Sequence, residues 1–167
     1  MRKSYQMALG GILAALSVVV MMLGGLIPLA TYVCPMLCAL LLFFVKNFCG
    51  TRIGWTWYVA VSILSLLLSP DKEAAAVFIA LGYYPILQPV LDRMPVKWLW
   101  KGLLFNGASI AMYLVLMYVF GMEQVLAEFQ ELGFIGLFLI LVLGNISFFL
   151  LDRLLHIMQK EFIKSAK

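Results

Sequence analysis

Six long apolar stretches follow one another along this chain, and they constrain its fold more than any other feature. They cover residues 8–27, 29–45, 53–68, 74–91, 98–120 and 133–155. A helix needs about 20 mostly apolar residues to cross the hydrocarbon core of a bilayer. Hydrophobic residues make up 65% of the sequence, which is more than one water-soluble core of this size can bury. We therefore predict an all-α integral membrane protein, a compact bundle of six spans that form a single transmembrane domain over residues 1–167.

The distribution of charge gives this bundle an orientation. With the N-terminus in the cytoplasm, eleven of the twelve Lys and Arg residues lie at cytoplasmic span ends, and only Lys72 faces outward. Basic residues accumulate on the cytoplasmic side of membrane proteins. The pattern requires an even number of spans, so we predict that both termini are cytoplasmic and that the protein lies in the inner cell membrane. A re-entrant segment around Pro28, in place of a boundary between two spans, is the alternative at that point.

The first stretch carries two pairs of small residues at helical spacing, Gly10 with Ala14 and Gly11 with Ala15. Small residues four apart let another helix approach closely in a membrane. Two interpretations remain open, internal packing within the bundle and a docking face for a partner membrane protein.

The second stretch begins with Thr31 and Tyr32, and Pro35 follows them. Proline at this position leaves the carbonyl four residues earlier without a backbone donor. Such carbonyls are tolerated at membrane depth where protein or a cavity surrounds them. Thr31 and Tyr32 are therefore candidates for contact with a small ligand, or they form a plain kink at the interface.

The fourth stretch contains Pro85 and Pro89, four residues apart, and the sequence predicts that its helix bends or breaks there. Gln88 lies at a depth similar to Asn106 of the fifth stretch and Asn145 of the sixth. We predict a cluster of polar side chains between these helices, which we call the polar knot. It either holds the helices together or acts as a coupling element during transport. The predicted knot consists of Tyr83, Tyr84, Gln88, Asn106 and Asn145.

Two polar segments lie between spans on the predicted outer side. Residues 69–73 form a compact turn, and residues 121–132 have the pattern of a short amphipathic helix. The second segment is either a lid over an outward pocket or a connector that rests on lipid. On the inner side, Asp152 and His156 are one helical turn apart. A proton relay is conceivable there, but a solvated helix end with local ion pairs is the preferred interpretation.

Several classes of function have no support in the sequence. The three cysteines lack further ligands at metal-binding spacing, and we expect neither a metal nor a cofactor. The chain contains no phosphate-binding loop, HExxH string or GxSxG string. We expect no enzymatic activity and no nucleic-acid partner. The basic residues are explained by membrane orientation and contact with membrane lipid.

The segment Met7-Ala8-Leu9-Gly10-Gly11-Ile12-Leu13-Ala14-Ala15-Leu16-Ser17 resembles the first helix of the substrate-binding S-components of energy-coupling factor transporters. The six-span layout and Pro28 after the first span are also similar. The resemblance is sharp only over roughly the first 30 residues. Glycine stands where the family has the first alanine of each pair.

The resemblance implies a fold, partners and sites. In that family, small residues of the first helix dock onto a transmembrane coupling subunit, and two ATPase subunits supply the energy. Gly10, Gly11, Ala14 and Ala15 would then form the docking face. The family's pocket lies near the outer surface and captures a vitamin or a similar micronutrient. Here the substrate-binding residues would be Thr31, Tyr32, Asp71, Lys72, Glu73, Tyr118 and Phe129.

The predicted function is therefore substrate capture for an ATP-driven uptake complex. The alternative is a non-transport scaffold or accessory subunit of a larger membrane complex.

Overall fold

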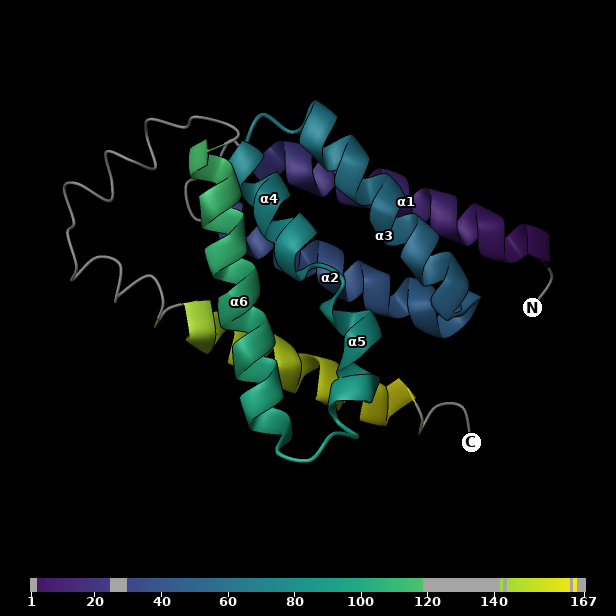
Figure 1. Cartoon of the computed structure of the whole chain (residues 1–167). Coiled ribbons are helices and arrows are strands. Elements are labelled where there is room, and N and C mark those ends of the chain that lie inside the picture. The colour runs from purple at the N-terminus through teal and green to yellow at the C-terminus, as the bar shows by residue number, and fades with distance from the viewer. Residues whose placement is uncertain (1–2, 25–29, 119–141, 143, 163, 165–167) are drawn as a thin grey trace. The chain divides into compact units, whose positions relative to one another are not determined.

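The computed structural model describes residues 3–24, 30–118, 142, 144–162 and 164. Over these residues the protein is helical and contains no strand, which confirms the all-α class. The labelled helices are α1 (Lys3–Gly24), α2 (Ala30–Cys49), α3 (Thr51–Leu68), α4 (Lys72–Leu81), α5 (Tyr84–Leu91) and α6 (Lys97–Tyr118) (Figure 1). A further helix, which carries no label, covers residues 144–162.

Five segments of the described chain are long and apolar enough to cross a membrane. They are Ser4–Gly24, Thr31–Cys49, Thr51–Leu68, Lys72–Leu91 and Lys97–Leu116. These segments match the first five predicted spans, with α4 and α5 together forming the fourth. The sixth predicted span, 133–155, begins outside the described residues. The six-span bundle and the cytoplasmic position of both termini therefore stay predictions.

Two helices extend beyond the predicted spans. The predicted spans leave residues 46–52 between the second and third spans, and in the structure α2 continues to Cys49, so only Gly50 separates it from α3. Gly50 has φ 94°, a left-handed conformation that favours glycine. The last helix continues beyond residue 155 to residue 162. The reason is the same in both places: charged residues mark the expected edge of a bilayer, but they do not end a helix.

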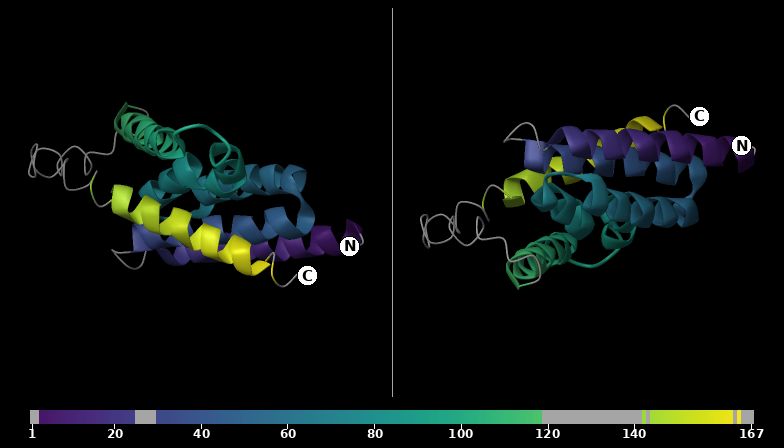
Figure 2. Two further views of the ribbon diagram at one scale, coloured as in Figure 1. Left: turned by 90° about the horizontal axis from the view of Figure 1, so that it is seen from below. Right: turned by 90° about the horizontal axis from the view of Figure 1, so that it is seen from above.

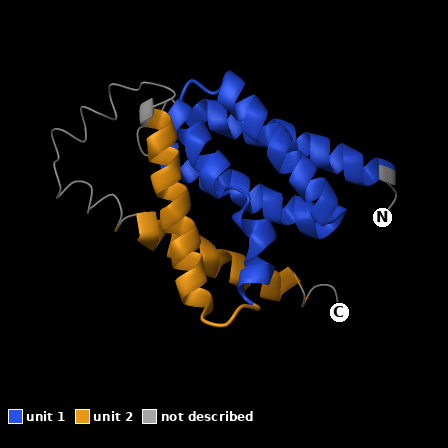
Figure 3. Cartoon of the chain, in the orientation of Figure 1, with its two compact units in different colours: residues 1–92 blue, residues 93–167 orange. Residues whose placement is uncertain are grey.

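The chain divides into two compact units, residues 1–92 and residues 93–167 (Figure 3). The first unit contains α1 to α5, and the second contains α6 and the helix over residues 144–162. We describe each unit by itself. The prediction of a single domain stays a prediction.

In the first unit, α1, α2 and α3 lie side by side, and α4 packs against them (Figure 2). The core contains Met21, Cys38, Leu42, Val61 and Phe78, all fully buried. Side chains of α3 and of its C-cap residue also donate hydrogen bonds to carbonyls of α1. The Trp57 Nε1 atom lies 3.0 Å from the Gly10 oxygen, and the Ser69 Oγ atom lies 3.1 Å from the Met21 oxygen. These two contacts show that α1 and α3 run parallel.

The fourth predicted span is broken at Gly82 and Tyr83, which confirms the bend or break that the two prolines predict. Pro85 has no N–H to donate to the carbonyl of Leu81, and its ring collides with that carbonyl in a continuous helix. The chain therefore ends α4 at Leu81 and begins α5 at Tyr84. The break separates two short helices within one apolar segment.

In the second unit, α6 runs antiparallel to the helix over residues 144–162. Two aromatic pairs pack between them. The ring centroids of Phe105 and Phe148 are 4.7 Å apart, and those of Trp98 and Phe149 are 5.6 Å apart. Both pairs are stacked, an arrangement that contributes beyond simple burial.

Candidate functional site

A cluster of hydroxyl and carboxylate groups lies at the end of the first unit where α2 and α4 begin. The Thr31 hydroxyl donates to Asp71 Oδ2 over 2.8 Å. The other carboxylate oxygen, Asp71 Oδ1, accepts the backbone N–H of Ala74 over 3.0 Å and thereby caps the N-terminus of α4. Asp71 therefore has two tasks, because it starts α4 and fastens that helix to α2.

A second contact of the same kind lies beside the first. The Tyr32 hydroxyl lies 3.2 Å from Glu73 Oε1, to which it donates. Tyr32 is 45% exposed, so part of its side chain is accessible at this contact. Thr31 and Tyr32 of α2 thus each meet one acidic residue at the start of α4. The structure brings together four of the seven predicted substrate-binding residues.

Lys72 lies between the two acids in sequence, but its side chain is engaged elsewhere. Its Nζ atom donates to the Leu66 oxygen over 2.7 Å and to the Ser69 oxygen over 3.0 Å. Carbonyls at the C-terminus of a helix attract a cation, so Lys72 caps α3. Its predicted role in binding a substrate stays a prediction.

Of the remaining predicted residues, Tyr118 is the last residue of α6 in the second unit. Phe129 lies outside the described residues, as does the predicted amphipathic segment 121–132. Their predicted contact with a substrate therefore stays a prediction.

We call the group of Thr31, Tyr32, Asp71 and Glu73 the α2–α4 cluster. It presents two carboxylates, each of which accepts from a hydroxyl group. Hydroxyl donors can rotate toward a ligand, and carboxylates accept several hydrogen bonds. The cluster is therefore equipped to bind a small polar solute. Among the described residues, no group of three or more His, Cys, Asp or Glu is arranged to hold a metal ion.

The two small-residue pairs of α1 face different ways. Gly10 is buried and Ala14 packs against the core, whereas Gly11 and Ala15 are exposed. A Cβ atom added at Gly11 would meet no heavy atom within 4 Å. Of the two interpretations left open by the sequence, internal packing fits Gly10 and Ala14. Gly11 and Ala15 remain available for a partner.

The residues of the predicted polar knot lie in both units. Tyr83, Tyr84 and Gln88 belong to the first unit, and Gln88 and Tyr84 are buried there. In the second unit, Asn145 Nδ2 donates to Asn106 Oδ1 over 3.1 Å, and Asn106 Nδ2 lies 3.4 Å from Asn145 Oδ1. This pair joins α6 to the last helix. A knot that also includes Gln88 stays a prediction.

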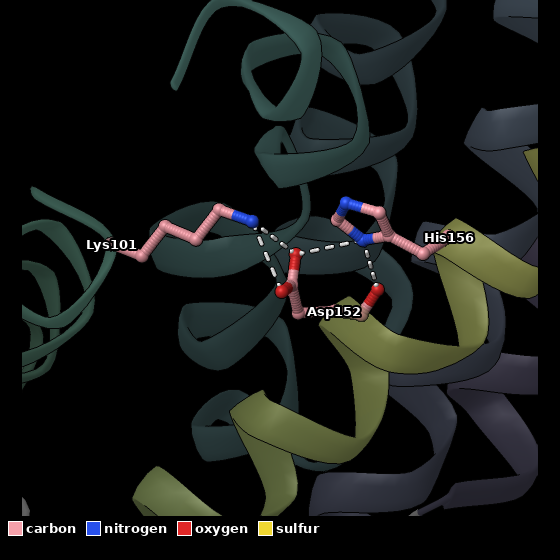
Figure 4. A network of polar contacts seen from close by, with 3 residues as sticks. All are labelled: Lys101, Asp152 and His156. Carbon is pink, nitrogen blue, oxygen red and sulfur yellow. Dashed lines mark hydrogen bonds and ion pairs between the residues drawn. The ribbon is translucent and has the colours of Figure 1, made fainter. Parts of the chain in front are cut away.

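Sequence reasoning missed a buried ion pair in the second unit (Figure 4). Lys101 Nζ lies 2.8 Å from Asp152 Oδ1 and 3.0 Å from Asp152 Oδ2. Both side chains are at most 10% exposed. His156 Nδ1 lies 3.5 Å from the same carboxylate and 2.9 Å from the Asp152 carbonyl oxygen. The preferred interpretation of this region is correct in the local contact between His156 and Asp152, but it is wrong in the solvation of Asp152, which is buried against a lysine of α6.

A signal for this pair was present in the sequence. Asn106 and Asn145 were expected at similar depth, and the two helices run in opposite directions. Five residues back from Asn106 lies Lys101, and seven residues beyond Asn145 lies Asp152. Since the two helices are antiparallel and Asn106 lies opposite Asn145, Lys101 and Asp152 lie at nearly the same height along the helix pair. The charge pattern alone places Lys101 among the predicted cytoplasmic basic residues.

The comparisons with known proteins find no match. No protein-family model, no curated protein and no solved structure matches the chain.

Proposed function

We propose that this protein is the substrate-capturing membrane subunit of an ATP-driven uptake transporter for a vitamin-like micronutrient, and that separate subunits energise it. The observation that carries the proposal is the α2–α4 cluster. Its four side chains come from two helices and lie at one end of the first unit, where a solute from the aqueous phase can reach the exposed Tyr32.

The exposed face of α1 supports the second part of the proposal, the dependence on partner subunits. Gly11 and Ala15 leave room over the helix backbone for another helix. This face is distinct from the α2–α4 cluster. Solute capture and partner docking therefore use different residues, and each can be tested without the other.

The test is native mass spectrometry of the full chain, purified in mild detergent together with whatever accompanies it. Glu73→Gln keeps the shape of the side chain and removes its charge. Asp71→Asn also keeps a good helix cap, since Asn and Asp cap α-helices about equally well. We expect both variants to lose a copurifying small molecule while they keep the partner subunits.

Gly11→Leu gives the complementary result. It fills the space over α1, so we expect loss of the transmembrane partner and the ATPases with retention of the small molecule. Gly107→Leu is the matched control, because Gly107 is an exposed helical glycine of α6 with no heavy atom within 4 Å of an added Cβ. An intact complex in Gly11→Leu contradicts the docking face.

The scaffold alternative predicts a different pattern. A scaffold has a constant partner without ATPases, and no small molecule that depends on Asp71 or Glu73. Gly11→Leu would still remove its partner. The two proposals therefore differ in the effect of the carboxylate variants and in the identity of the partner.

A further inference from the structure

The joint between α4 and α5 is bridged by side chains of other helices. On the α4 side, the Tyr58 hydroxyl of α3 donates to the carbonyl of Ile79. On the α5 side, the Lys46 Nζ atom of α2 donates to the Pro85 oxygen over 2.9 Å. Near the joint, α4 is therefore tied to α3 and α5 is tied to α2, in each case through a hydrogen bond to a carbonyl oxygen.

The contact between Lys46 and Pro85 has a specific cause in the sequence. In a continuous helix the carbonyl of residue 85 accepts the N–H of residue 89. Residue 89 is proline, which has no N–H, so the Pro85 carbonyl lacks this donor. The ladder resumes after Pro89, because the N–H of Asp92 donates to the Gln88 oxygen over 2.9 Å. The Lys46 ammonium group thus supplies the hydrogen bond to the Pro85 carbonyl that a backbone N–H at position 89 would otherwise donate.

The surroundings of this contact are closely packed. Pro85 is buried and Lys46 is half-buried. At Gly54 of α3, an added Cβ would lie 3.6 Å from the Cα atom of Lys46 and 3.6 Å from the Cδ1 atom of Ile86. Helices α2, α3 and α5 therefore meet at the point where the ammonium group reaches the carbonyl.

We propose that Lys46 is a latch on a hinge between α4 and α5. A backbone hydrogen bond in this place would be released only by unwinding the helix. The lysine side chain can leave the Pro85 carbonyl by rotating about its own bonds while α2 and α5 stay helical. With the latch closed, α5 is held to α2, and with the latch open, α5 moves about residues 82–83. In a membrane a carbonyl without a donor is unfavourable, so the closed state predominates.

The test is a double-mutant cycle of Lys46→Met and Pro89→Ala in the full chain in lipid nanodiscs. The readout is hydrogen exchange of peptides that cover residues 82–92, because exchange of protected amides reports the population of locally opened states. A hydrogen bond from a charged donor is stronger than a neutral one. We expect Lys46→Met alone to raise exchange by about tenfold or more.

In the Pro89→Ala background the alanine N–H can donate to the Pro85 carbonyl. We then expect Lys46→Met to change the exchange of residues 82–92 by less than about twofold. Lys160→Met is the matched control, since Lys160 is an exposed lysine of the second unit, and it should leave this segment unchanged.

Exchange in α1 separates hinge opening from unfolding of the whole unit. If Lys46→Met unfolds the first unit but the double variant remains folded, the latch is supported. Equal effects of Lys46→Met with Pro89 and with Ala at position 89 overturn the proposal. An absence of any effect of Lys46→Met on residues 82–92 overturns it as well.

Discussion

The polar contacts between helices within the first unit differ in kind from those within the second unit. In the first unit, several side chains donate to backbone carbonyls of neighbouring helices, as Trp57 does to Gly10 and Lys46 to Pro85, and side chains also pair with one another in the α2–α4 cluster. In the second unit, the described contacts between helices pair one side chain with another, as in Lys101 with Asp152 and Asn106 with Asn145.

This difference decides how each unit responds to substitution. A side chain that donates to a carbonyl can be removed, but its acceptor belongs to the backbone and cannot be substituted with it. A pair of side chains can be removed together, which leaves no unpaired group. A contact in the second unit can therefore be repaired by replacing both side chains of the pair, whereas a carbonyl of the first unit that loses its donor needs a new donor, as Pro89→Ala supplies to the Pro85 carbonyl.

The largest effect is expected from Asp152→Ala, because it leaves the buried Lys101 without its carboxylate. Removal of one partner of a buried ion pair destabilises by about 3–5 kcal/mol, whereas replacement of both partners by apolar residues is often neutral. We expect Lys101→Met with Asp152→Leu to restore most of the loss. Unfolding of the full chain by detergent titration measures both. Equal destabilisation in the single and double variants would remove the distinction between the units.

The next effect is expected in the first unit, from Gly82→Ala at the end of α4. An added Cβ would lie 2.5 Å from the Phe78 oxygen and 2.6 Å from the Phe78 ring, which is fully buried. Overpacking of this kind destabilises by about 1–3 kcal/mol. Gly107→Ala is the control, and it should be neutral or stabilising because its surroundings are open. The same unfolding titration compares them, and equal stability of the two variants would contradict the tight packing at Gly82.

The smallest effect is expected from the asparagine pair of the second unit. Hydrogen bonds between side chains of membrane helices contribute on average about 0.6 kcal/mol. A double-mutant cycle of Asn106→Leu and Asn145→Leu should give a coupling energy of about that size. A coupling well above about 2 kcal/mol would indicate that the pair belongs to a larger polar network, such as the predicted knot.

Much of the helical layout follows from sequence patterns. Runs of apolar residues locate the helices, and Pro85 with Pro89 locates the break, because a missing N–H and a ring clash act locally. The association of Asn106 with Asn145 also follows from their similar depth in neighbouring spans. These features depend on position along one helix or on depth alone, and both can be read from the sequence.

The contacts of the three buried or capping lysines could not be predicted in the same way. Lys46, Lys72 and Lys101 look alike as charged residues near span ends, and the charge pattern predicts only the side of the membrane on which each one lies. In the structure they bind a freed carbonyl, a helix C-terminus and an aspartate. A lysine reaches its partner through a long flexible side chain, so the partner depends on how the helices pack. The exposure of Gly11 and the burial of Gly10 depend on packing for the same reason.

The central claim is that the protein captures a solute and is energised by other subunits. Native mass spectrometry of the wild-type complex in mild detergent tests it most directly. The account predicts a bound small molecule, together with a second membrane subunit and ATPase subunits. An empty chain, or a constant partner without ATPases, would contradict the claim and favour the scaffold.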